Sequence, residues 1–263
     1  MKFLGIDTST TMASVALVED GGLIAEEFHE GNTKFGDPSA PTGRSNHAEI
    51  LLPLIERLVK RANVTLSEIS AFAVSIGPGS FTGLRIGLST VKGLSYGWET
   101  PVVGVPTLLA LAARVTDWKG LICPFLDARR KEVYTALFYK REDGGLEQIS
   151  GDLVCPPERI IREIQCGYRE TCLFIGDGTR VYEEMIRANL ADRAIATLGN
   201  SYPSTAFSAA RIAEEKVKRG EIDSPGPLVP LYLRPSEAEL KKGLKWNLTG
   251  KQDSTVPLTK LRP

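Results

Sequence analysis

Between two apolar segments stands the glycine-rich stretch Gly77-Pro78-Gly79-Ser80-Phe81-Thr82-Gly83-Leu84-Arg85-Ile86-Gly87. A turn of this kind between a buried strand and a helix exposes backbone N–H groups at the positive end of the helix dipole, which suits an anion. The stretch lacks the Gly-Lys-Ser/Thr of a P-loop, and its third glycine comes one residue too late for a dinucleotide-binding motif. Phosphate contact and a tight turn with close helix packing therefore stay open as alternatives.

Glycines also interrupt the helix that this turn opens, and each costs roughly 1 kcal/mol relative to alanine in a helix interior. They are Gly83, Gly87 and Gly93. Gly79, Gly83 and Gly87 recur every four residues, so they share one helix face and let another backbone approach closely. We predict that this face docks against a neighbouring helix, either within the fold or on a partner protein.

Outward from the turn, hydrophobic periodicity predicts the same order of elements twice. In the first half, strands and helices are expected at 2–7, 13–18, 23–28, 50–62, 71–76, 80–96 and 102–105. In the second half, they are expected at 121–126, 132–139, 146–149, 157–165, 172–175 and 180–189. Each half opens with a strand that ends in an acidic residue and continues through a hairpin with an Asp-Gly-Gly turn. The repeated order indicates a structural duplication.

Two β-β-β-α-β-α lobes side by side resemble the superfamily of actin, Hsp70 and the sugar kinases, in which nucleotide lies in the cleft between the lobes. We expect an α/β fold with an N-terminal lobe over 1–106 and a C-terminal lobe over 107–200. A further helix at 205–219 is expected to pack back on the first lobe. Residues 220–263 are expected to form a Pro-rich segment and, beyond Trp246, a polar mobile tail.

The composition is that of a globular protein: 42% of the 263 residues are hydrophobic, 24% are charged, and 32 Lys+Arg balance 32 Asp+Glu. A net charge of zero supplies no global basic field for nucleic acid, so we expect a partner to hold any RNA. No apolar run reaches the roughly 18–20 residues that span a bilayer, and Asp7 comes too early for a signal peptide. Four cysteines without a C-x-x-C pair favour reduced thiols. The chain is expected in the cytoplasm and not at a membrane.

Candidates for catalysis and metal binding are scarce. The two histidines, His29 and His47, lie on different predicted elements and cannot form a metal-binding pair one helical turn apart. No serine has a histidine obviously beside it that could activate it as a nucleophile. We therefore predict neither a bound metal nor a catalytic residue.

Three turns occupy the places at which the superfamily contacts phosphate, metal and adenosine. The first is Asp7-Thr8-Ser9 after the first strand, the second begins at Asp127, and the third is Gly176-Asp177-Gly178. The nucleotide cleft predicted from them comprises Asp7, Thr8, Ser9, Asp127, Gly176 and Asp177. Polar turn residues that only cap local structure are the commoner alternative at each place.

At residues 77–87 the chain resembles the TsaB (YeaZ) family, the partner proteins in bacterial synthesis of threonylcarbamoyladenosine at position 37 of tRNAs. Further matching motifs cover nearly the whole chain: Gly5-Ile6-Asp7-Thr8-Ser9, Leu51-Leu52-Pro53-Leu54-Ile55, Gly104-Val105-Pro106-Thr107-Leu108, Asp127-Ala128-Arg129, Glu132-Val133-Tyr134 and Tyr232-Leu233-Arg234. The family's catalytic relative, TsaD, carries a metal-binding histidine pair after strand five, whereas residues 105–111 here hold no metal ligand. The resemblance thus implies a non-catalytic member, an inactive homologue of proteins once interpreted as peptidases.

The resemblance also implies a scaffold or activator that binds a TsaD-like transferase, with a TsaE-like ATPase joining the pair and tRNA contacted only indirectly. In the family, the helices at 50–62 and 80–96 form a bundle with the same helices of the transferase or, in its absence, with those of a second copy. The implied partner and dimer surface comprises His47, Leu51, Leu54, Ile55, Leu58, Gly79, Gly83, Leu84, Gly87 and Val91. The chain itself requires no cofactor, and ATP or ADP could bind at the partner interface. The alternative is an ATP-dependent small-molecule kinase or a carbamoyl or acyl transferase of the same superfamily.

Overall fold

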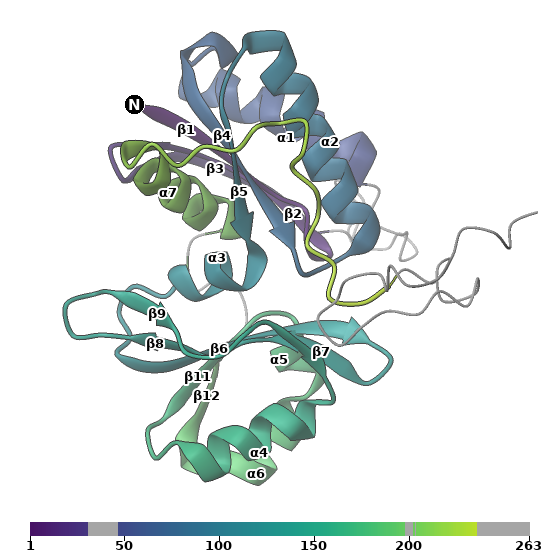
Figure 1. Ribbon diagram of the computed structural model, residues 1–263, viewed down its shortest axis with the longest axis vertical. Helices are drawn as coiled ribbons and strands as arrows, with labels where there is room; N and C mark the ends of the chain where they lie inside the picture. Colours follow the sequence, from purple (N-terminus) through teal and green to yellow (C-terminus); the bar gives the residue numbers. More distant parts are fainter. Residues whose placement is uncertain (31–46, 198–201, 203, 236–263) are drawn as a thin grey trace, which may run out of the picture.

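In the computed structural model, which describes residues 1–30, 47–197, 202 and 204–235, the chain forms two lobes that lie one above the other in Figure 1. The N-terminal lobe is built on a five-stranded sheet with the order β3-β2-β1-β4-β5. Its strands are β1 (Lys2–Asp7), β2 (Met12–Glu19), β3 (Gly22–Glu30), β4 (Ile69–Gly77) and β5 (Val102–Pro106). β1, β4 and β5 run parallel, and β2 and β3 form an antiparallel meander beside β1.

Helices cover both faces of this sheet. α1 (His47–Ala62) and α2 (Phe81–Trp98) pack on one face, and α7 (Thr205–Lys218) packs on the other. Because both faces are covered, β1 and β4 are nearly continuous apolar runs rather than alternating ones. The small side chains of α7 that meet the sheet let the helix lie close to β1: Ala206, Ala209, Ala210 and Ala213. No helix in the described part of the chain is long and apolar enough to cross a bilayer.

The C-terminal lobe repeats this arrangement. Its strands are β6 (Gly120–Arg129), β7 (Glu132–Thr135), β8 (Phe138–Lys140), β9 (Leu146–Gln148), β10 (Leu153–Cys155), β11 (Cys172–Ile175) and β12 (Ala194–Thr197). Its helices are α4 (Pro157–Gly167), α5 (Gly178–Val181) and α6 (Glu183–Leu190). The order β10-β7-β6-β11-β12 matches the N-terminal sheet strand for strand, with β6 in the place of β1. The predicted duplication into two α/β lobes is confirmed.

Three predicted elements of this lobe are wrong in detail. The strand expected at 132–139 is two strands, because β6 is long enough to pair with β7 at its C-terminal end and with β8 at its N-terminal end. The buried Ala136 and Leu137 carry the apolar pattern through the break, so the sequence does not reveal it. The strand expected at 146–149 is β9, which pairs with β8, and β10 takes the place of the third strand. The helix expected at 180–189 divides into α5 and α6.

A short helix that is not predicted from the sequence, α3 (Thr107–Ala113), lies between the lobes in Figure 1. Leu108 and Leu111 belong to an apolar cluster of the C-terminal lobe. Ala110, between them, packs instead in the cluster that joins α7 to the N-terminal sheet. α3 therefore links the two cores at the point where the sequence places the boundary between lobes.

Residues 220–235 form a strap that leaves α7, passes along α2 and reaches the level of the C-terminal lobe (Figure 1). Asp223 forms an antiparallel bridge with the edge strand β5, and its Oδ2 accepts the Gly104 N–H at 2.8 Å. Part of an otherwise open sheet edge is thereby paired. The tail expected beyond Trp246 lies outside the described residues.

Candidate functional site

The glycine face of α2 packs against the turn after β1, inside the N-terminal lobe. A Cβ atom on Gly83 would overlap the carbonyl oxygen of Thr8, and one on Gly87 would overlap the Thr8 hydroxyl oxygen. Thr8 Oγ1 donates a hydrogen bond to Gly83 O at 2.8 Å, and the Ser80 N–H donates to Ser9 O at 2.7 Å. The lobe's own core therefore needs this face of α2 to be free of side chains.

The docking residues predicted from the sequence are not on the surface. Apart from Gly79, which is half-buried, all of them are buried within the lobe: His47, Leu51, Leu54, Ile55, Leu58, Gly83, Leu84, Gly87 and Val91. Periodicity shows which helix face is buried but not what covers it. In this chain the sheet and the turn after β1 cover these residues, and their contact with a partner stays a prediction.

Asp7 ends β1 in a buried position, with 2% of its surface exposed. Its Oδ1 accepts the Ser9 N–H at 3.2 Å. Burial raises the pKa of the Asp7 carboxyl above its ordinary value, against the lowering effects of Ser9, Ser75 and the charge of Arg114. Thr8 and Ser9 are buried as well. α2 packs against Thr8 and Ser9 of this turn, whereas the groups that act on the buried Asp7 carboxyl are Ser9, Ser75 of β4 and Arg114 after α3.

The second and third predicted turns meet in the C-terminal lobe. Asp177 Oδ1 accepts the Asp127 N–H at 3.0 Å, and Asp127 Oδ1 accepts the Arg129 N–H at 2.8 Å. Gly176 has a φ of 127°, and a Cβ atom there would lie 2.5 Å from Phe125 O. The structure therefore brings Asp127, Gly176 and Asp177 together, but as groups that fasten two turns to each other.

The carboxylates of Asp7, Asp127 and Asp177 each accept a backbone N–H of their own lobe, which gives each of them a structural role in its turn. Nucleotide binding at these turns stays a prediction. Within residues 1–30, 47–197, 202 and 204–235, no three His, Cys, Asp or Glu side chains are grouped to hold a metal. His47 is buried, with its Nε2 3.3 Å from Thr11 O.

The opposite face of α2 carries a surface that the predicted residues do not include. Gly93 and Gly97 are exposed, and a Cβ atom on either would meet nothing within 4 Å. Ser89, also exposed, extends this stripe of small residues by one helical turn. Near the stripe, Tyr96 is 68% exposed. We call these four residues, Ser89, Gly93, Tyr96 and Gly97, the outer α2 face; the four-residue spacing of Gly93 and Gly97 is the sequence signal that could have revealed it.

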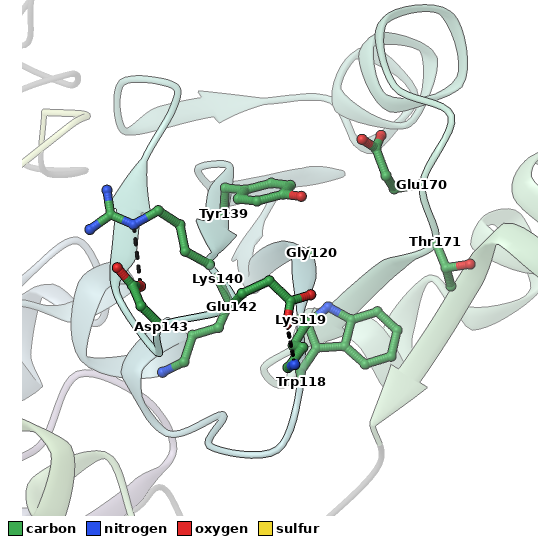
Figure 2. A pocket seen from close by; sticks show the side chains of 10 residues that line it. Trp118, Lys119, Gly120, Tyr139, Lys140, Glu142, Asp143, Glu170 and Thr171 are labelled. Atoms are coloured by element: carbon green, nitrogen blue, oxygen red, sulfur yellow. Dashed lines mark hydrogen bonds and ion pairs between the residues drawn. The ribbon is translucent and has the colours of Figure 1, made fainter.

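A cavity of about 690 Å³ opens at the other end of β6 from Asp127 (Figure 2). Charged side chains around it pair with one another: Lys119 with Glu142, and Arg141 with Asp143 at 3.4 Å (Figure 2). None of the residues predicted from the sequence as site residues lines this cavity. The cavity is therefore separate from the turns and helix faces described above.

The sequence is similar to those of proteins that are named for tRNA modification. Residues 41–242 match the family model of TsaD, tRNA N6-adenosine threonylcarbamoyltransferase. The chain is 30% identical to the tRNA threonylcarbamoyladenosine biosynthesis protein TsaB of Bacillus subtilis, over 92% of this chain and 97% of that protein. The chain belongs to the TsaB family. The TsaB protein of Haemophilus influenzae is 28% identical over 92% of this chain and 97% of its own.

Solved structures agree with membership of the TsaB family. YeaZ from Pseudomonas aeruginosa matches 88% of this chain and 99% of its own, with a TM-score of 0.70 and 28% identity. Component A of the (R)-2-hydroxyglutaryl-CoA dehydratase of Acidaminococcus fermentans, at 9% identity and a TM-score of 0.51, shares the fold alone. The duplicated sheets and this likeness agree on the predicted two-lobed α/β fold. The threonylcarbamoyltransferase of Bacillus subtilis is 31% identical over 58% of this chain and 45% of its own length.

Proposed function

We propose that this chain is a non-catalytic partner of a TsaD-like transferase in the threonylcarbamoyladenosine modification of tRNA. Its Bacillus subtilis relative is named for the biosynthesis of that nucleoside, and the family model that matches residues 41–242 is that of the transferase. The scaffold is shared, but α2 packs against the Asp7 turn, where the superfamily holds phosphate and metal. These features fit a protein that activates the transferase by binding to it.

The observation that carries this proposal is the outer α2 face. Gly93 and Gly97 each weaken the helix by roughly 1 kcal/mol relative to alanine, yet neither is needed for packing inside the lobe. The side chains at a contact decide how closely two helices approach, and glycine permits the closest approach. Tyr96 beside the stripe adds exposed aromatic area of the kind that anchors protein interfaces. The transferase is expected to lay a helix across this face.

The other proposed partners are inferred from the outer α2 face and from the resemblance to the TsaB family. A second copy of the chain binds the outer α2 face when the transferase is absent, so homodimer and complex exclude each other. A TsaE-like ATPase joins the pair at another surface. The chain needs no cofactor of its own, ATP or ADP at the partner interface stays a prediction, and the complex works in the cytoplasm.

Reconstitution tests the proposal. Addition of the chain to a purified TsaD-like transferase should increase formation of the modified nucleoside, whereas the chain alone should form none. The alternative, an ATP-dependent small-molecule kinase or a carbamoyl or acyl transferase, requires specific nucleotide binding by the isolated chain. Calorimetry with ATP and Mg²⁺ separates the two: stoichiometric binding that Asp7→Ala abolishes would favour the enzyme and contradict the partner role.

A further inference from the structure

The turn between β6 and β7 holds three consecutive residues in the left-handed backbone conformation. Arg129, Arg130 and Lys131 have φ values of 60°, 55° and 61°. This conformation is unfavourable for residues with a Cβ atom, and glycine, asparagine or aspartate usually adopts it. Backbone strain of this kind persists only where the surroundings enforce it, and it is concentrated at functional sites.

Neighbouring residues hold the turn in place. Asp127 Oδ1 accepts the Arg129 N–H at 2.8 Å. From the strap, Arg234 Nη2 donates to Ala128 O and Arg234 Nη1 donates to Glu132 Oε2, both at 2.8 Å. The two carboxylates that flank the turn, those of Asp127 and Glu132, are thereby engaged by its backbone or by the strap.

The cations of the turn lie on the surface. Arg129, Arg130 and Lys131 are all exposed. In the part of the chain that the structure describes, no carboxylate pairs with the side chain of Arg129 or Lys131. The turn between β8 and β9 differs, because Arg141 there pairs with Asp143 at 3.4 Å. The β6–β7 turn is thus a local positive surface on a chain whose net charge is zero.

We propose that this turn contacts phosphate groups of the tRNA backbone through Arg129 and Lys131. The inference rests on the proposed function, which makes tRNA the substrate of the complex. Lysine and arginine on a fixed turn suit this role, because phosphate contacts position a nucleic acid without reading its bases. A net charge of zero excludes a global basic field but not a local one, so the expectation of purely indirect tRNA contact does not extend to this turn.

The strap places the turn near the opposite end of α2 from the outer α2 face. Tyr232 of the strap stacks on Phe81, the first residue of α2, with ring centroids 4.6 Å apart. Arg234 follows Tyr232 closely in the strap and holds the turn. Gly93 and Gly97 lie in the second half of α2. The tRNA can therefore meet the turn while the transferase occupies the outer α2 face, and mutations can separate the two contacts.

The test is the salt dependence of tRNA binding by the full chain in complex with the transferase. The variant Arg129→Asn/Lys131→Asn removes two charges and retains side chains that accept the left-handed conformation. The control Arg162→Gln/Arg169→Gln removes the same charge from the exposed surface at α4 and the loop after it. An unmodified tRNA transcript is the probe, titrated by fluorescence anisotropy between about 50 and 200 mM salt.

In the turn variant we expect the slope of log affinity against log salt to fall in magnitude by about 1.4 to 1.8, which is roughly 0.7 to 0.9 for each phosphate contact. The control should keep the wild-type slope. In Lys131→Gly the salt-dependence slope should fall by about half as much as in the double variant. Its melting temperature should be higher than that of the wild type, since glycine relieves the strain.

An unchanged slope in the turn variant, or an equal loss in the turn variant and the control, would overturn the inference. Weaker binding of the transferase with unchanged tRNA affinity would also overturn it, because the turn would then be a protein contact. The proposed function is tested separately, by the stimulation of the transferase at saturating tRNA. If the wild-type chain stimulates the transferase while the slopes stay equal, the inference fails and the proposed function stands.

Discussion

At Gly83 a hydrogen atom in place of a methyl group lets α2 lie against the end of β1. We expect Gly83→Ala to lower the free energy of unfolding by about 1–3 kcal/mol, the usual penalty for overpacking. The new Cβ atom would overlap Thr8 O, a backbone atom that cannot turn aside. Gly93→Ala is the matched control in the same helix; it meets nothing and should gain up to about 1 kcal/mol. Urea denaturation measures both, and wild-type stability in Gly83→Ala would contradict the packing described here.

Asp7 makes stability depend on pH. Burial raises the pKa of the Asp7 carboxyl above its ordinary value of 3.8, so the folded protein binds this proton more tightly than the unfolded chain. The stability that the protonated group contributes is present below pH 3.8 and is lost as the pH rises through the raised pKa. Asp7→Asn, which stays neutral, should therefore gain stability relative to wild type as the pH rises from about 4 to about 7. Urea denaturation across this range tests it, and a constant difference between the two proteins would refute it.

The carboxylates of Asp7 and Asp127 also show how much of the candidate site the sequence could predict. Asp7 and Asp127 stand at the ends of β1 and β6, as the order of elements predicts. Whether a carboxylate is open to a ligand depends on what packs against it. At Asp7 the neighbouring groups include Ser75 and Arg114, far along the chain, and a local pattern does not contain those contacts.

At the scale of single elements, α1 and α2 show what hydrophobic periodicity can predict. Their apolar stripes predict both helices to within a few residues of their observed bounds, together with the faces that are buried. The stripes cannot show that a sheet covers those faces, and for this reason they do not distinguish a packing face from a docking face. The break between β7 and β8 escaped prediction for a related reason, since β6 pairs with both strands and buried residues bridge the gap.

At the scale of the whole molecule, the strap ties the two lobes together in addition to α3. We expect Arg234→Ala to lower the free energy of unfolding by about 1–3 kcal/mol, because it removes two hydrogen bonds of a charged group that is partly exposed. Arg234→Lys keeps the charge but not the forked geometry of the guanidinium group, so its free energy of unfolding should lie between those of the wild type and Arg234→Ala. Hydrogen exchange at residues 128–132 should quicken in both variants, and Arg169→Ala, at an exposed position, is the control. Unaltered exchange in that segment would show that the strap does not hold the turn.

Docking through the outer α2 face is tested most directly by Gly93→Leu. The new side chain enters open space in the isolated chain, so the melting temperature should stay at or slightly above the wild-type value. In the complex it would separate the two helices, and we predict that affinity for the TsaD-like transferase, measured by calorimetry, falls by about tenfold or more, or 1.4 kcal/mol. Gly93→Ala should weaken the complex less. Wild-type affinity in a normally folded Gly93→Leu protein would contradict docking through this face.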